Sequence, residues 1–304
     1  MKSRPKVSTG FYTSRFEDDD YVCVYCADRG YAMDMRIDTK KDFIPNSYEY
    51  AFHYSCPLHN VIDNDEINIP VSYDKQTKYG MTYKINNEGF RSDDFTSVHN
   101  KKHILFAGCS NTYGDGLEYE ETWAHMLYSK ILINEELSGY FNLGLLGGKI
   151  SQIIANIFTY CKLYAKPDVI FFLAPTVSRE LYQMQDQSEL NKKEKGISFL
   201  FKAKTVFDTY LALDEYCKTN NILLITRTWD IKKHSLVGTK SVLKEFDSFH
   251  DYDEEKEYIP LLNSFIEKNR KRNRLIFAED KVHSGIAQNY VDSELFYKIY
   301  LEAQ

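Results

Sequence analysis

From about residue 100 onward, short apolar runs alternate with segments of helical periodicity. Four runs indicate buried strands, and a fifth strand is expected near the end of the chain: 103–108, 140–146, 168–174, 222–229 and 275–280. The runs are continuous, as is typical of parallel strands covered on both faces. Apolar residues at helical spacing, as between Ile150 and Cys161, supply the covering helices. The alternation predicts an α/β fold, a three-layer α/β/α sandwich with a mainly parallel sheet.

Residues 1–98 lack this alternation. We expect them to form a small N-terminal annex, mostly β or irregular, ahead of an α/β domain over 99–304. A chain of 304 residues is long enough for such a division. Two polar insertions, 183–196 and 230–258, interrupt the α/β part. Loops of this kind commonly form lids or specificity walls, and plain surface decoration is the alternative.

Charge and hydropathy exclude several classes of protein. A formal net charge of -6 argues against a nucleic-acid binder, and the one basic run, 270–274, is expected to be a solvated stretch. No apolar run approaches the roughly 18 residues of a membrane span. The first residues lack the apolar core of a secretory signal, and the six cysteines are scattered, which suits a reducing compartment. We therefore expect a cytoplasmic protein.

The stretch FAGCSNTYGDGL, residues 106–117, places Ser110 directly after the first strand and follows it with Gly114 and Gly116. In open parallel sheets, active residues lie outside the carboxyl ends of the strands. A serine held there can act as a nucleophile if a general base lies within reach.

Asp280 and His283 stand three residues apart in AEDKVHSG, just before the last helix. A histidine oriented by a carboxylate is the base that a weak hydroxyl nucleophile needs. Because the pair follows the expected strand at 275–280, we expect it at the same sheet edge as Ser110. The three residues together predict a catalytic triad.

These segments resemble the SGNH (GDSL-type) hydrolase family over roughly two thirds of the chain, from about residue 80 onward, in four ordered blocks. FAGCSNTYGDGL is similar to the first block and carries Ser110 as nucleophile. FNLGLLGGK is similar to the second, with Asn142 opening the pattern and Gly147 as the oxyanion glycine. PDVIFFLAPTVSRE takes the third place, and DKVHSG, with the acid and the base, the fourth. NNEGFRSDDF, which contains Arg91, looks like a segment that often precedes this core.

Two positions depart from the family pattern. Cys109 stands where the family has an aspartate before the serine, and Thr176, with Ser178 nearby, stands where it has an asparagine. The resemblance implies an oxyanion hole built from the backbone amides of Ser110 and Gly147 together with the Thr176 hydroxyl. Loss of one oxyanion donor typically costs on the order of 10²–10³ in rate.

The resemblance implies a serine esterase or acylhydrolase, acting through an acyl-serine without a cofactor. Its substrate would be a small-molecule, carbohydrate or lipid ester, for example of a short acyl or acetyl group. An acyltransferase that uses the same serine is one alternative. The other, favoured by the altered third block, is a weakened or inactive SGNH-fold protein that serves as a binding or structural module.

The annex offers a separate possibility. Cys23 and Cys26 form a C-x-x-C pair, and with Cys56 and His59 they would supply the ligands of a tetrahedral zinc site. His53 competes for the fourth position, and the second half lacks a clean paired spacing. We expect these cysteines to be buried without a metal.

Overall fold

The computed structural model describes residues 11–15, 21–26, 36–38, 73–77, 80–97, 101–180, 192–229 and 238–304. Its centre is a four-stranded parallel sheet in the order β7-β6-β8-β9. The bounds are Ile104–Gly108 for β6, Phe141–Gly144 for β7, Val169–Ala174 for β8 and Leu223–Thr228 for β9. All residues of the first three strands are buried, which explains their uninterrupted apolar runs.

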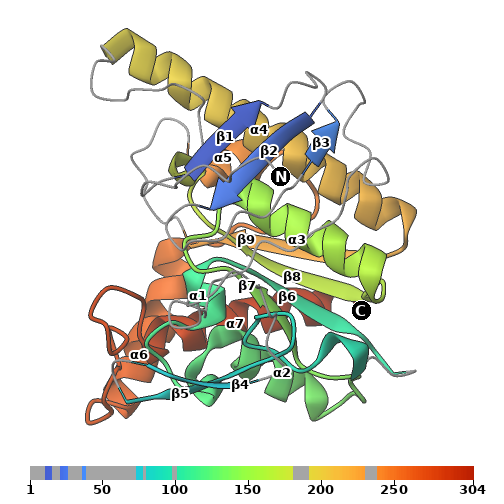
Figure 1. Cartoon of the computed structure of the whole chain (residues 1–304). Coiled ribbons are helices and arrows are strands. Elements are labelled where there is room, and N and C mark those ends of the chain that lie inside the picture. Colours follow the sequence, from blue (N-terminus) through green and yellow to red (C-terminus); the bar gives the residue numbers. More distant parts are fainter. Residues whose placement is uncertain are drawn as a thin grey trace.

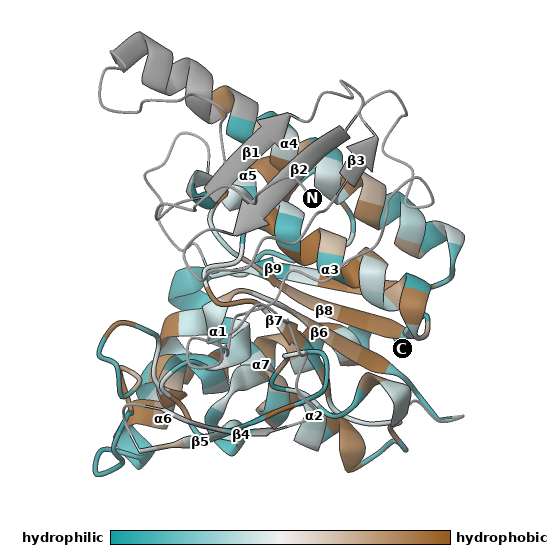
Figure 2. Ribbon diagram, in the orientation of Figure 1, coloured by the Kyte–Doolittle hydropathy of each residue, from teal (hydrophilic) through white to brown (hydrophobic). Residues whose placement is uncertain are grey.

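Helices cover both faces of the sheet and complete the three layers (Figure 1). Leu105 and Ala107 face one helical layer, and Ile104 and Phe106 face the other. The first layer contains α3 (Ile150–Leu163), α4 (Lys192–Thr219) and α5 (Thr239–Leu243). The second contains α2 (Trp123–Leu132) and α7 (Ile286–Glu302). Figure 2 shows the strands as a hydrophobic band between these layers, so the predicted α/β sandwich is confirmed.

The prediction of a strand at 275–280 is wrong. The segment forms a single bridge, between Phe277 and Ser284, and joins no ladder of the sheet. Backbone carbonyls at its start accept hydrogen bonds from the first amides of α7 instead. The Ile286 amide donates to the Arg274 carbonyl and the Ala287 amide to the Leu275 carbonyl, both at 2.9 Å. These bonds satisfy amides that a helix N-terminus would otherwise leave without a partner.

Short helices fill the connections. They are η3 (Phe95–Ser97), α1 (Ser110–Tyr113), η4 (Tyr119–Glu121), η5 (Val177–Arg179), the π-helical turn η6 (Glu254–Tyr258) and α6 (Ile259–Lys268). The insertion expected at 183–196 overlaps α4, and that at 230–258 contains α5 and η6. No described helix combines the length and the apolar character that a membrane crossing requires.

The described parts of the first 98 residues are largely β. One antiparallel sheet has the order β1-β2-β3, and β4 and β5 form a hairpin. The bounds are Phe11–Arg15, Tyr21–Cys26, Arg36–Asp38, Tyr73–Gln76 and Thr82–Ile85. The boundary at residue 98 stays a prediction. Of the zinc ligands considered, Cys56 and His59 lie outside the described residues, as do the side chains of Cys23 and Cys26 in β2.

A buried ion pair joins the edge strand β9 to α7. The Arg227 guanidinium is fully buried, and its Nη1 lies 3.8 Å from Oδ1 of Asp292. The rings of Tyr252 and Phe296 lie 4.5 and 5.4 Å from the guanidinium carbon, and no nitrogen of that group has a hydrogen-bond partner in the described part of the chain. Burial raises the pKa of the Asp292 carboxyl to about 6, although the neighbouring Arg227 acts against the rise. The pair is therefore poorly compensated when both groups are charged.

The raised pKa of Asp292 predicts that the free energy of unfolding falls as the pH rises. An unfolded aspartate loses its proton at about pH 4, whereas the folded Asp292 keeps its proton up to about pH 6. Between these values the folded state binds more protons, so it loses roughly 3 kcal/mol of stability as the pH rises. In urea unfolding, the stability of Asp292→Asn relative to the wild type should increase over this pH range. Asp247→Asn is the control, because that carboxyl is exposed and has no ion pair among the described residues. A pH-independent difference between Asp292→Asn and the wild type would contradict this.

Candidate active site at the carboxyl edge of the sheet

Ser110 begins α1, immediately beyond the carboxyl end of β6, and its side chain is buried. Two glycines let α1 lie directly on the ends of the strands. A Cβ at Gly108 would lie 2.0 Å from the Thr112 hydroxyl oxygen, and a Cβ at Gly144, the end of β7, would lie 2.3 Å from the Tyr113 amide nitrogen. Both distances are far below contact, so glycine is required at each strand end. The predicted position of Ser110 is the one observed.

Gly114 and Gly116 serve two different purposes after the serine. Gly114 ends α1 in the left-handed conformation, φ 77° and ψ 46°, and its amide donates to the Ser110 carbonyl at 2.9 Å. Gly116 also has a left-handed φ, +76°, and a Cβ there would lie 2.9 Å from the Cβ of Ala278. The second glycine therefore lets the segment that carries Asp280 approach residues 110–117, which we call the serine turn.

Asp280 and His283 form the predicted acid–imidazole pair. Oδ2 of Asp280 is hydrogen-bonded to Nδ1 of His283, and Oδ1 accepts from the amides of Val282 and His283, each at 3.0 Å. Burial works to raise the pKa of the Asp280 carboxyl, but the two amide bonds and the imidazole outweigh it and lower the pKa. The carboxylate is thus held ionised against Nδ1, and Nε2 is left for a substrate or a nucleophile.

A backbone hydrogen bond joins the histidine loop to the serine turn. The Glu279 amide donates to the Gly116 carbonyl at 2.9 Å. Oδ2 of Asp115 lies 3.9 Å from Nδ1 of His283, so a second carboxylate also faces the imidazole. In the described chain, the Ser110 hydroxyl has one contact, to the Cys109 sulfur at 4.0 Å, and no hydrogen bond to His283. The structure brings the two loops together but does not join base and serine directly.

Asp115 was not predicted as a site residue, although it lies in the quoted stretch FAGCSNTYGDGL, because that pattern gave it no role of its own. Together with Asp280 and His283 it forms a group whose potential ligand atoms all lie within 4.8 Å of one another. Nδ1 of His283, however, is already hydrogen-bonded to Asp280. The arrangement therefore fits an oriented imidazole better than a metal-binding group.

Gly147 and Thr176, the expected oxyanion residues, both follow strand ends at the same edge. Gly147 is exposed with φ +67°, and a Cβ there would meet no atom within 4 Å. Thr176 follows β8, and its hydroxyl is hydrogen-bonded to the Ser178 hydroxyl at 2.5 Å. Among the described residues, the amides of Ser110 and Gly147 donate to no acceptor. Asn142 has a structural role, because its amide group donates to the Thr112 carbonyl at 2.9 Å and its Oδ1 accepts from the Gly144 amide at 2.7 Å.

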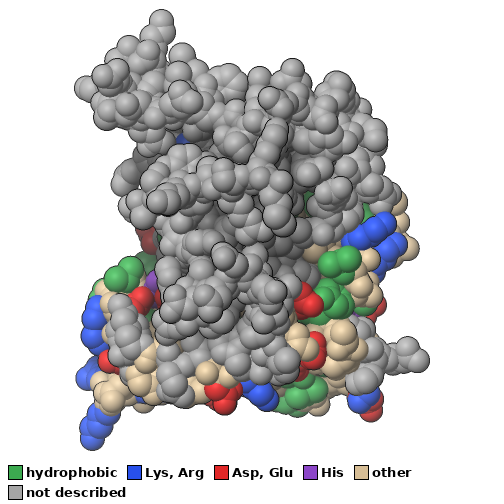
Figure 3. Space-filling view, in the orientation of Figure 1, with side chains coloured by type: hydrophobic (Ala, Val, Ile, Leu, Met, Phe, Trp, Pro, Cys, Tyr) green, Lys and Arg blue, Asp and Glu red, His purple; other side chains and the backbone are tan. Residues whose placement is uncertain are grey.

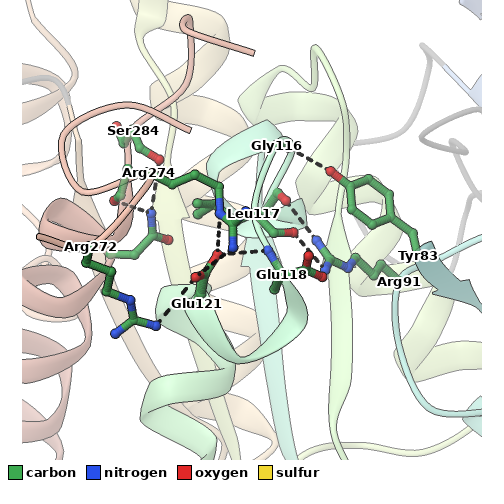
Figure 4. A network of polar contacts seen from close by, with 12 residues as sticks. Tyr83, Arg91, Gly116, Leu117, Glu118, Glu121, Arg272, Arg274 and Ser284 are labelled. Atoms are coloured by element: carbon green, nitrogen blue, oxygen red, sulfur yellow. Dashed lines mark hydrogen bonds and ion pairs between the residues drawn. The ribbon is translucent and has the colours of Figure 1, made fainter. Parts of the chain in front are cut away.

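Arg91 holds the serine turn from the N-terminal side (Figure 4). The guanidinium is buried, and it donates to three carbonyl oxygens: those of Tyr113 at 3.3 Å, Gly114 at 2.7 Å and Leu117 at 3.0 Å. Its carbon lies 4.0 Å from the ring centre of Tyr83. The Tyr83 hydroxyl in turn accepts from the amide of the same turn, at Gly116, at 2.7 Å. Sequence reasoning missed this role, since Arg91 and the turn lie more than twenty residues apart.

A second arginine holds the other side of the turn. Arg274 donates to both carboxylate oxygens of Glu121, at 2.9 and 3.1 Å, and the Glu118 amide donates to the same carboxylate at 3.1 Å. Burial works to raise the pKa of Glu121, but the bonds from Arg274 and the Glu118 amide prevail and lower it. Because Arg274 precedes the histidine loop, this pair ties that loop to the segment after Ser110 (Figure 4).

The comparisons with known proteins find distant similarity. No protein-family model matches the sequence, and no curated protein matches it. Two solved structures are similar in fold. The psychrotrophic esterase EstA of a Pseudoalteromonas species, inhibited by monoethylphosphonate, has 15% identity and a TM-score of 0.41, covering 66% of this chain and 97% of its own. A member of the lipolytic protein G-D-S-L family from Veillonella parvula has 16% identity and a TM-score of 0.36, covering 65% of this chain and 97% of its own.

Replacing Arg91 by lysine tests whether the hydrogen bonds of its guanidinium stabilise the serine turn. Lysine keeps the charge but cannot donate to three carbonyls in a fixed fork. Buried carbonyls would lose their donors, so we expect the free energy of unfolding to drop by about 1–3 kcal/mol. Arg270→Lys, in an exposed pair with Glu267, should change it by less than about 0.5 kcal/mol. Equal urea midpoints for Arg91→Lys and the wild type would show that the guanidinium is not needed.

Proposed function

We propose that the protein is a serine esterase in which Ser110 is the nucleophile, His283 the general base and Asp280 the group that orients it. One observation carries the proposal: the Asp280–His283 pair is fastened to the turn that carries Ser110 by the bond from Glu279 to Gly116. A buried serine at a strand end and an oriented imidazole on the adjoining loop are the components of acyl transfer to a hydroxyl.

The proposed reaction proceeds in two steps. His283 takes the proton of the Ser110 hydroxyl through Nε2 as the oxygen attacks the ester carbonyl, and it returns the proton to the leaving alcohol. Water then attacks the acyl-serine with the same base, which releases the acid and restores the serine. Asp280 stays ionised and stabilises the imidazolium in both steps. The lowered pKa of its carboxyl supports this role.

The oxyanion would be bound by donors that have no other partner. In the described part of the chain, the amides of Ser110 and Gly147 donate to no acceptor, so both are available to a substrate oxygen. Thr176 can donate as a third group if Ser178 donates to it, because either hydroxyl can be the donor in their bond. Such preorganised donors favour the charge that develops in the transition state.

The nucleophile is tested by Ser110→Ala. Hydrolysis of p-nitrophenyl acetate should be abolished, because the change removes the proposed nucleophile. The melting temperature should stay nearly unchanged, since the Ser110 hydroxyl makes one weak contact, to the Cys109 sulfur. Activity in the variant equal to that of the wild type would remove Ser110 from the mechanism.

The oxyanion role of Thr176 has its own test. Thr176→Ala should lower kcat about tenfold or more with a smaller effect on KM, because the contact is made mainly in the transition state. Ser178→Ala should have a smaller effect, because Ser178 acts only by orienting the Thr176 hydroxyl. If Ser178→Ala lowers kcat and Thr176→Ala leaves it unchanged, the donor at this position is Ser178 instead.

A further inference from the structure

The loop that carries His283 is a short hairpin, which we call the 276–285 hairpin. Its two arms are joined by bonds from the Ala278 amide to the His283 carbonyl, at 3.0 Å, and from the Gly285 amide to the Ile276 carbonyl, at 2.9 Å. Ala278 is fully buried and packs with Leu117. The hairpin is thus anchored to the body of the protein through one side.

The hairpin also exposes three large apolar side chains. Ile276 is 50% exposed, Phe277 54% and Val282 77%. Single exposed apolar residues are common on protein surfaces, but three large ones within seven residues are an unusual concentration, and we call these three the apolar patch of the hairpin. Ile276 and Phe277 belong to the run that would have been buried in the strand expected at 275–280.

The surroundings of this patch are cationic, although the whole chain has a net charge of -6. Between residues 267 and 284 there are six lysines and arginines against three acidic residues. Three of the six are in ion pairs: Arg270 with Glu267, and Arg272 and Arg274 with Glu121. Lys271 and Lys281 are exposed and have no acidic partner within 4 Å in the described part of the chain. Figure 3 shows hydrophobic and basic side chains, with some acidic ones among them, along the left edge of the molecule, the region where Figure 1 places the end of α6 and the loop before α7.

We propose that the 276–285 hairpin docks onto an anionic lipid bilayer. The three apolar side chains would enter the boundary between headgroups and acyl chains, and the surrounding lysines and arginines would contact lipid phosphates. Apolar side chains beside basic ones form the combination that binds such surfaces, and each lysine or arginine near an anionic leaflet strengthens binding roughly fivefold.

The shape and charge of the hairpin favour a bilayer over a protein partner. A stable protein interface usually buries at least about 1,000 Å², whereas three side chains on a projecting hairpin offer a small patch that a deformable surface can accept. Two copies of this chain would bring the same cationic segment against itself, which like charges oppose. Both points leave an anionic lipid surface as the partner that fits.

Co-sedimentation of the full chain with vesicles tests the proposal independently of any activity. The protein should bind vesicles of phosphatidylcholine with about 30% phosphatidylglycerol, and binding should weaken with salt and be at least about tenfold weaker on phosphatidylcholine alone. The combined change Ile276→Ser, Phe277→Ser and Val282→Ser should reduce binding at least about tenfold. The change Arg270→Gln, Lys271→Gln and Lys281→Gln should reduce it by a comparable or larger factor.

The matched control is Leu132→Ser, Ile133→Ser and Leu301→Ser. These residues are 47%, 80% and 54% exposed, close to the values in the hairpin. They lie at the ends of α2 and α7, toward the opposite edge of the sheet, where Lys102, just before β6, donates to Tyr300. The control should bind vesicles as the wild type does. Val282→Ser alone, at the most exposed position, should still weaken binding severalfold if the triple variant fails to fold.

Three results would overturn the proposal. One is a wild type that does not bind the anionic vesicles, and another is a hairpin variant that binds them as well as the control does. The third is a wild type that elutes as a dimer in size-exclusion chromatography without binding vesicles, together with a monomeric hairpin variant. That result would assign the patch to a second copy of the chain.

Discussion

The buried Arg91 guanidinium is the interaction on which the arrangement of the site depends. The last carbonyl groups of a helix find no donor within the helix. Because α1 has only four residues, most of its carbonyls need a donor from elsewhere. Two nitrogens of Arg91 donate to the carbonyls of Tyr113, Gly114 and Leu117, at the end of α1 and in the turn after it, and the ring of Tyr83 lies against the guanidinium. The turn fixed in this way contains Gly116, whose carbonyl accepts from Glu279, the neighbour of Asp280. The turn after Ser110 and the loop that carries His283 are therefore held together next to a turn that Arg91 fixes.

Much of the fold follows from the sequence because its signals are local. Continuous apolar runs identify strands covered on both faces, and all four strands of the sheet were predicted in this way. The run at 275–280 has the same composition, but its carbonyls accept from the first amides of α7, and two of its apolar residues face solvent. An apolar pattern does not reveal which partner a backbone group will find. The strand prediction failed for that reason.

The site shows the same division between local and distant signals. Asp280 and His283 are three residues apart, so their pairing could be predicted from spacing, and Ser110 from its place after a strand. Tyr83 and Arg91 reach the site through folding, and no spacing in the sequence relates them to it. Asp115 lies in the stretch quoted around Ser110, but nothing in that stretch places its carboxylate near the imidazole of His283. The part that sequence reasoning missed is thus the part that holds the turn after Ser110 in place.

The central claim is that Ser110 is a nucleophile activated by His283, and covalent labelling tests it most directly. Intact-mass analysis after incubation with a fluorophosphonate should show one adduct, and peptide mapping should place it on Ser110. A folded His283→Ala variant should label at least about a hundredfold more slowly, because general-base assistance contributes on the order of 10²–10⁴. An unlabelled wild type, an adduct on another residue, or equal labelling rates with and without His283 would contradict the account.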